Sequence, residues 1–193
     1  KEKLLKDIKD LTGLVFEVDK TTNLLVYKGI SGEEWSGSSA AAIGVLEVLA
    51  NPLTDIKVTS IAKKGAGAAP DNRNSYYSFT INLDPSTIES FMKNCGDLNA
   101  STVGYAITFV HELQHTPTSF FRQTGHEGTD NILPFENLVR VQMGPAYGIK
   151  KQFQTRTGIN PSDTSTYFLF EYNGEEKTIR GNLYWDEDQW KRK

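Results

Sequence analysis

Cysteine and histidine are both scarce in this chain of 193 residues, which has one cysteine and three histidines. Because Cys95 is the only cysteine, no internal disulfide can form, and a thiolate metal site would have one such ligand at most. No apolar run approaches the roughly 18 residues that a membrane helix needs, and no N-terminal signal pattern is present. The sequence therefore excludes a disulfide scaffold and predicts no membrane span.

An excess of charge of one sign is also missing. The chain has 21 Lys and Arg against 24 Asp and Glu, mixed along its length, for a net charge of -3. A basic stripe that would suit a phosphate backbone is therefore absent, and nucleic acid is not an expected partner. With 38% hydrophobic and 23% charged residues, the composition is that of a folded globular domain. Because the chain begins at Lys1, we expect a mature product or a piece of a longer protein.

Apolar spacing and turn residues predict helices interspersed with hairpins. Helices are expected over 1–11, about 40–50, 85–94, 102–115 and 134–143, and strands over 14–18, 24–27, 55–62, 76–83 and 167–172. The second helix has Ala40, Ile43, Leu46 and Leu49 at helical spacing, and 64–74 is predicted to be loop. Asn173-Gly174 is a strong hairpin signal. This order predicts an α+β fold with a mostly antiparallel sheet, in one domain over 1–193 with a core of about 10–155 and a hairpin and tail over 156–193.

The pentapeptide His111-Glu112-Leu113-Gln114-His115 is the clearest chemical signal in the chain. On a helix, residues i and i+4 project from one face, so both imidazoles can close on one metal ion. Glu112 is turned about 100° away, where it can reach a water that the ion holds. The alternative, a histidine pair that merely packs or faces solvent, would not explain a glutamate in this register.

This spacing predicts a zinc site for hydrolysis. Catalytic zinc keeps one position for water, lowers the pKa of that water towards about 7 and polarises a carbonyl. We therefore expect His111 and His115 to be zinc ligands. Glu112 is expected to be the general base that accepts the proton of water and passes it to the leaving amine.

A third protein ligand must come from elsewhere in the chain. A third histidine six residues after His115 would give the metzincin pattern, but that position is Phe121, and Thr118 stands where the pattern has glycine. The remaining downstream ligands are His126, Glu127, Asp130 and Glu136. Glu136 is favoured because it lies in a predicted helix, 21 residues after His115, and His126 is the second choice. The alternative for Glu136 is an ordinary i, i+4 surface pair with Arg140.

Two segments together resemble a known family. The run from Gly104 to His115, followed by Phe135-Glu136-Asn137-Leu138-Val139-Arg140, is similar to the HExxH plus ENxxR pattern of effector-type zinc metallopeptidases. Such domains occur in type III secretion effectors and at the C-termini of polymorphic RHS-repeat toxins. The resemblance covers about residues 10–155 and implies a zincin-like fold. It also implies peptide-bond hydrolysis inside a target cell, Glu136 as the helix carboxylate, and Arg140 as a structural or substrate-orienting partner.

The resulting hypothesis is a secreted or delivered zinc endopeptidase that acts on a protein or peptide substrate, with an inhibitor or immunity protein as a possible further partner. The strand 76–83 is expected to be the sheet edge that pairs with an extended substrate. Tyr147 and Arg140 are the nearest candidates for an oxyanion donor. The alternatives are a non-catalytic, zinc-stabilised binding or adhesion module, and a metallohydrolase that acts on a substrate other than peptide.

Overall fold

The computed structural model describes residues 1–70, 77–119, 129–154 and 165–182. Its α-helices are α1 (Glu2–Thr12), α2 (Ser39–Leu49), α3 (Pro85–Lys93), α4 (Tyr105–Leu113) and α6 (Thr129–Met143), with 3-10 turns η1 (Ala100–Val103) and η2 (Pro145–Tyr147). Its strands are β1 (Leu14–Val18), β2 (Leu25–Ile30), β3 (Asp55–Ser60), β4 (Gly67–Pro70), β5 (Ser78–Leu83), β6 (Ile149–Gln154), β7 (Ser165–Tyr172) and β8 (Glu175–Asn182). The predicted α+β class is confirmed.

The described strands form small sheets with the orders β1-β2, β3-β5-β4 and β6-β7-β8. Their pairings are antiparallel, except that β5 runs parallel to β3, with Asp55 opposite Ser78. The hairpin between β7 and β8 turns at Asn173 and Gly174, whose φ angles of 53° and 78° are the positive values that this dipeptide tolerates. The sequence prediction of this hairpin is confirmed.

The middle sheet corrects two predictions. The segment 64–74 was expected to be loop, but it contains β4, whose Gly-Ala-Ala-Pro sequence has little strand preference of its own. Pairing with β5 makes it a strand, with Ala68 opposite Ile81. Consequently β5, which is most of the predicted strand 76–83, is the central strand rather than the substrate-binding edge. Among the described strands, β3 and β4 are the outer strands of this sheet.

Helix α2 is oriented differently from its predicted apolar stripe. Its fully buried positions are Ala41, Gly44, Val45 and Val48, whereas Ile43 is 57% and Leu46 is 37% exposed. Because nearly every residue of this helix is small or apolar, hydrophobic spacing alone does not select a face. The small residues of the buried face allow close approach to α6, where Phe135 lies against Gly44.

The boundaries of the two helices that matter for the site also differ from the prediction. The predicted helix 102–115 is divided into η1 and the shorter α4, so that His115 follows the last α-helical residue, Leu113. Helix α6 begins at Thr129 rather than at Pro134, which lies inside it. Pro134 is the sixth residue of α6, where proline removes one backbone hydrogen bond and crowds the preceding turn, but the helix continues through it. Strand β6 was not predicted.

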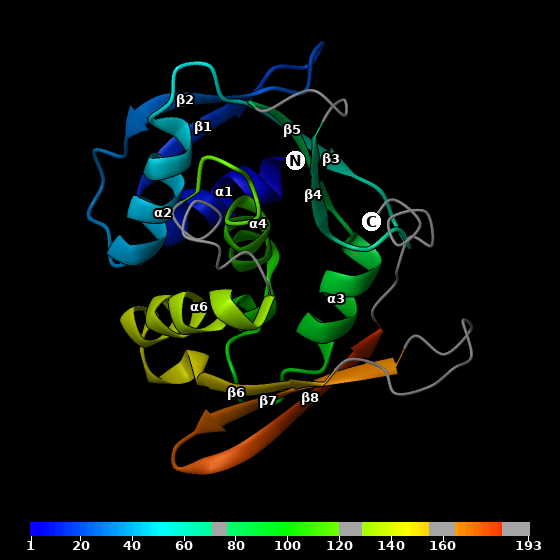
Figure 1. Ribbon diagram of the computed structural model, residues 1–193. Helices are drawn as coiled ribbons and strands as arrows, with labels where there is room; N and C mark the ends of the chain where they lie inside the picture. The colour runs from blue at the N-terminus through cyan, green and yellow to red at the C-terminus, as the bar shows by residue number, and fades with distance from the viewer. Residues whose placement is uncertain (71–76, 120–128, 155–164, 183–193) are drawn as a thin grey trace.

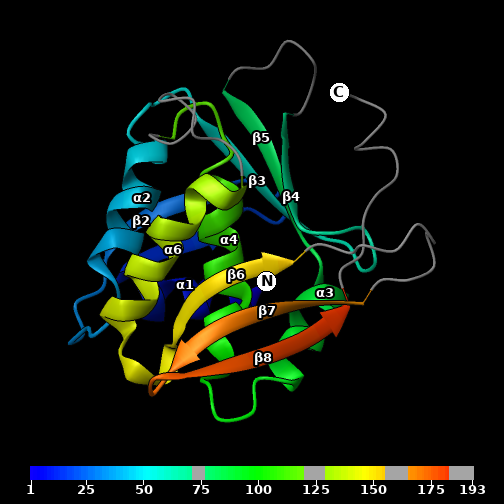
Figure 2. The same ribbon diagram turned by 60° about the horizontal axis from the view of Figure 1, so that its bottom comes forward.

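Helix α4 lies in the middle of the molecule, packed between α1, α2, β5 and α6 (Figure 1). The main core surrounds it, and Phe109, Val110 and Leu113 are fully buried there. The sheet β6-β7-β8 lies across one end of the molecule, beside α3 and α6 (Figure 2). Phe170 and Ile179 of that sheet form a second core cluster with residues of α3 and of the segment that follows it. His111 and Glu112 are therefore carried by a helix that other elements pack against on several sides.

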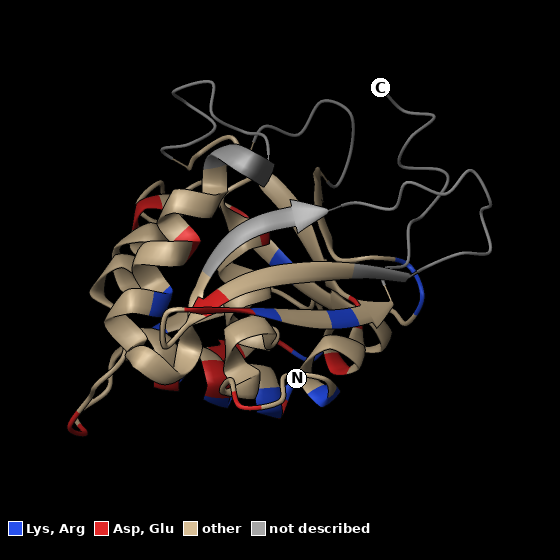
Figure 3. Ribbon diagram, turned by 90° about the horizontal axis from the view of Figure 1, so that it is seen from below, with Lys and Arg blue, Asp and Glu red and all other residues tan. Residues whose placement is uncertain are grey.

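Basic and acidic residues are interspersed on the face seen from below (Figure 3). None of the helices in the described ranges combines the length and apolar character that crossing a bilayer requires.

Candidate metal centre

The chain turns sharply at the end of α4, and side chains fix this turn. Gln114 ends the helix, and the His115 N–H donates to the Glu112 carbonyl at 3.1 Å. The Thr116 hydroxyl donates to the Leu113 carbonyl at 2.7 Å, and the Ser119 hydroxyl donates to the Gln114 carbonyl at 2.5 Å. These bonds satisfy carbonyls that a helix end leaves without partners. The backbone around both histidines is therefore well defined.

The two histidines converge as the spacing predicted. The Nε2 atoms of His111 and His115 lie 3.1 Å apart, with their ring centroids 5.0 Å apart and the ring planes at 70°. The His111 side chain is only 14% exposed. Two ring nitrogens at this separation can share one proton in a hydrogen bond, or both can bind one metal ion.

Glu112, the predicted general base, is 9% exposed and lies on the side of α4 that faces β4. Burial raises the pKa of this carboxyl above its ordinary value, because the charged form loses water. The nearby His111 lowers the pKa, Glu136 raises it, and a hydrogen bond from the Ala68 backbone lowers it, each by less than burial does. The result is a carboxyl with increased proton affinity beside the histidine pair.

Glu136 of α6 contacts His111, as the sequence suggested. It does so at Nδ1, whereas the Nε2 atom of His111 faces His115. The Oε1 of Glu136 forms a very short contact with the Nδ1 of His111, and its Oε2 accepts a 3.0 Å hydrogen bond from Arg140. The Glu136 side chain is 5% exposed. The alternative of an exposed Glu136–Arg140 surface pair is therefore wrong, since both side chains are buried. The assignment of Glu136 as a zinc ligand stays a prediction.

The Arg140 side chain contacts several other residues of the protein. Its Nε donates to the Thr102 carbonyl at 3.1 Å, its NH1 bonds Glu136, and its guanidinium lies 5.4 Å from the centre of the Phe170 ring. It joins α6 to the turn before α4 and to the sheet β6-β7-β8. These contacts are structural ones within the protein, and a role of Arg140 towards a substrate stays a prediction.

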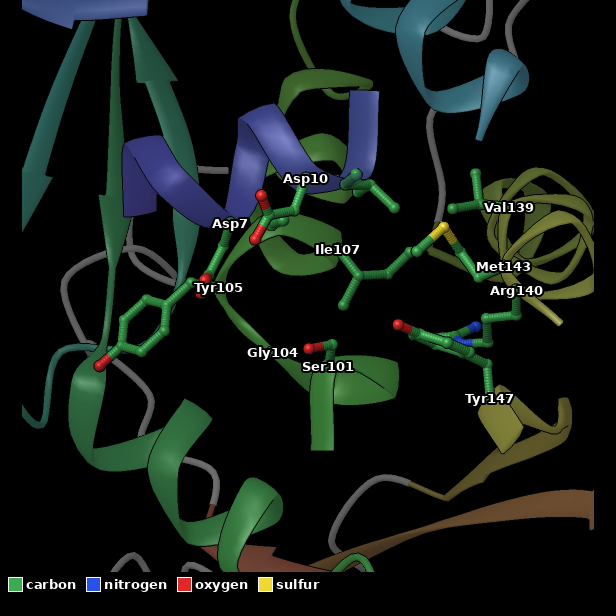
Figure 4. Close-up of a pocket in the computed structure, with 12 residues that line it drawn as sticks. Asp7, Asp10, Ser101, Gly104, Tyr105, Ile107, Val139, Arg140, Met143 and Tyr147 are labelled. Atoms are coloured by element: carbon green, nitrogen blue, oxygen red, sulfur yellow. The ribbon is translucent and has the colours of Figure 1, made fainter. Parts of the chain in front are cut away.

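Tyr147, the other predicted oxyanion donor, lines a cavity of about 60 Å³ whose walls include neither histidine of the motif. Figure 4 shows Asp7 and Asp10 of α1 on one side of this cavity and Arg140 and Tyr147 on the other. Burial raises the pKa of Tyr147, and Asp10 raises it further. Arg140 lines this cavity, and the histidine pair does not.

The other candidate ligands are not placed. His126 and Glu127 lie outside the described residues, and Asp130 is in the first turn of α6 with its side chain outside them. Among the residues that are described, no group of three or more His, Cys, Asp or Glu side chains is arranged to hold one ion. The sequence analysis also missed the contributions of Ala68 and Thr102. Both act through backbone groups, for which a sequence has no signal.

No protein-family model matches this chain, and neither the curated proteins nor the solved structures contain a significant match.

Proposed function

We propose that this protein is a zinc-dependent endopeptidase in which His111 and His115 hold the ion and Glu112 is the general base. The observation behind the proposal is the 3.1 Å separation of the two Nε2 atoms. With Zn–N bonds of about 2.0–2.1 Å and tetrahedral angles, two ligand nitrogens of one ion lie roughly 3.3 Å apart. The pair is therefore already close to the spacing that zinc needs.

The remaining residues fit hydrolysis better than structural binding. When bound, zinc would acidify a water and polarise the scissile carbonyl. Glu112 would accept the proton of the attacking water and deliver it to the leaving amine. Glu112 is buried next to the histidine pair, on the side of α4 that faces β4, so its carboxyl is held inside the proposed site. A purely structural zinc site has no use for a non-ligand carboxylate in this position.

Strand β4 is the place where we expect a peptide substrate to bind. It is one of the two outer strands of its sheet among the described strands, and its Ala68 backbone hydrogen-bonds Glu112. An extended peptide added along this edge would run past the general base, with its carbonyls near the histidine pair. The substrate class that follows is an extended segment of a protein.

The biological setting of the proposal comes from the resemblance of the HExxH and ENxxR segments. On that basis we propose a secreted or delivered effector with a protein target and an inhibitor or immunity protein as partner.

The test compares wild type, Glu112→Gln, His111→Ala and the surface control Glu47→Gln, which replaces an exposed glutamate of α2. Zinc content is measured by elemental analysis, and cleavage of a degenerate peptide library is followed by mass spectrometry with and without a chelator. We expect wild type, Glu112→Gln and Glu47→Gln to hold one zinc and His111→Ala to lose it. Cleavage by Glu112→Gln should fall by about 10²–10⁴-fold.

Wild type without stoichiometric zinc, or a Glu112→Gln variant as active as wild type, would contradict the proposal. Zinc binding without cleavage of any peptide would favour the second candidate, a zinc-stabilised binding or adhesion module.

A further inference from the structure

The two nitrogens of the His111 ring face different partners. Nε2 points to the Nε2 of His115, while Nδ1 meets the Oε1 of Glu136. These nitrogens lie on opposite sides of the imidazole, so an oxygen bonded to Nδ1 is roughly 6 Å from a metal ion bound at Nε2. From this position Oε1 cannot also ligate the ion that the two histidines share.

The other oxygen of Glu136 is also fixed. Oε2 accepts a hydrogen bond from Arg140, whose Nε is anchored on the Thr102 carbonyl and whose guanidinium lies over Phe170. The Glu136 and Arg140 side chains are 5% and 4% exposed, so the pair is a buried ion pair. Turning the carboxylate towards Nε2 would break this pair inside the protein, which is unfavourable because it leaves Arg140 charged and unpaired.

We infer that Glu136 is a positioning residue rather than the third zinc ligand. Its carboxylate accepts the Nδ1–H of His111, which selects the tautomer whose Nε2 lone pair is available and fixes the ring with Nε2 towards His115. Arg140 in turn fixes the carboxylate. Histidine ligands in metalloproteins usually donate their other N–H to such a carboxylate, and its loss lowers metal affinity moderately rather than abolishing binding. The inference rests on the proposed zinc site and assigns the third ligand to a residue other than Glu136.

The experiment measures zinc affinity by competition with a chromogenic chelator and records the absorption spectrum of the cobalt-substituted protein. The variants are Glu136→Gln, Glu136→Ala, His115→Ala as a ligand-loss reference, and Glu47→Gln as the control for a removed charge. Glu136→Gln has nearly the same shape as the wild-type side chain and retains an acceptor for Nδ1–H, so it remains informative if Glu136→Ala fails to fold.

We expect Glu136→Gln to bind one zinc with affinity about 10- to 100-fold weaker than wild type. Its cobalt spectrum should match that of wild type, because the set of ligand atoms is unchanged. His115→Ala should lose far more affinity and show an altered spectrum. The inference is overturned if Glu136→Gln loses as much affinity as His115→Ala, or if its cobalt spectrum changes while that of Glu47→Gln does not.

Proton NMR of histidine-labelled protein gives a second readout, which is simple because the chain has only three histidines. In the zinc-loaded wild type, the Nδ1–H of His111 should give a downfield, slowly exchanging signal that is absent in His111→Ala and shifted in Glu136→Gln. A signal unaffected by Glu136→Gln would overturn the inference while leaving the proposed function intact. Wild type that binds no zinc would overturn both.

Discussion

Gly44 of α2 lies directly against Phe135 of α6, the residue next to Glu136. A Cβ atom at Gly44 would be 2.8 Å from the Phe135 Cζ and 3.1 Å from the Gln114 Nε2. Gly44→Ala should therefore destabilise the protein by about 1–2 kcal/mol, because the overpacking cost exceeds the helix preference gained. Urea unfolding measures this change. Gly32→Ala, where a Cβ meets nothing within 4 Å, is the matched control, and equal effects of both would disprove the contact.

Asp84 connects the start of α3 to the segment that leads into β4. Its buried carboxylate caps α3 by accepting the N–H groups of Ser86 and Thr87, and it also accepts those of Lys63, Lys64 and Gly65. Asp84→Ala leaves these donors without a charged partner inside the protein. We expect a loss of about 3 kcal/mol or more in thermal or urea unfolding. Asp97→Ala, at an exposed carboxylate, should cost under about 0.5 kcal/mol. A similar loss in both variants would contradict this role.

Local signals predicted much of the fold. The helix predicted over 1–11 is α1, which ends at Gly13 with a φ of 71°, and the helix predicted from 85 is α3, which Asp84 caps. The errors arise where tertiary contacts decide the outcome. Strand β4 exists because it pairs with β5, and the buried face of α2 is the one that fits Phe135 rather than the one with the largest side chains.

The candidate site likewise has features that local spacing predicts and features that tertiary contacts decide. The i, i+4 spacing predicted that His111 and His115 converge, and the turn after Leu113 keeps His115 beside His111. Which nitrogen of His111 meets Glu136 depends on how α4 and α6 pack, and no spacing in the sequence encodes it. The buried state of Arg140 was likewise not evident, since an i, i+4 Glu–Arg pair looks the same on an exposed helix face.

Arg140 provides a test of that buried network by stability alone. Arg140→Lys keeps the positive charge, but an ammonium group cannot reproduce the separate bonds from Nε to Thr102 and from NH1 to Glu136. We expect a loss of about 1–3 kcal/mol in the free energy of unfolding of the metal-free protein. Arg180→Lys, at an exposed arginine over Tyr167, should change it by no more than about 0.5 kcal/mol. An Arg140→Lys variant as stable as wild type would show that the network is not formed.

Glu112 makes the stability of the metal-free protein depend on pH. Burial raises the pKa of Glu112, so the folded state binds its proton more tightly than the unfolded state does. The stability contributed by this group is therefore full below the unfolded pKa of about 4.3 and is lost as the pH rises through the higher folded-state value.

Glu112→Gln removes the titration, and in chelator-treated protein the variant should become more stable relative to wild type as the pH rises from about 4 to neutrality. Urea unfolding across this pH range measures the difference, and Glu47→Gln corrects for the loss of one surface charge. A difference between wild type and Glu112→Gln that stays constant with pH would mean that the carboxylate is hydrated in the folded protein. The buried position of Glu112, the proposed general base, would then be wrong.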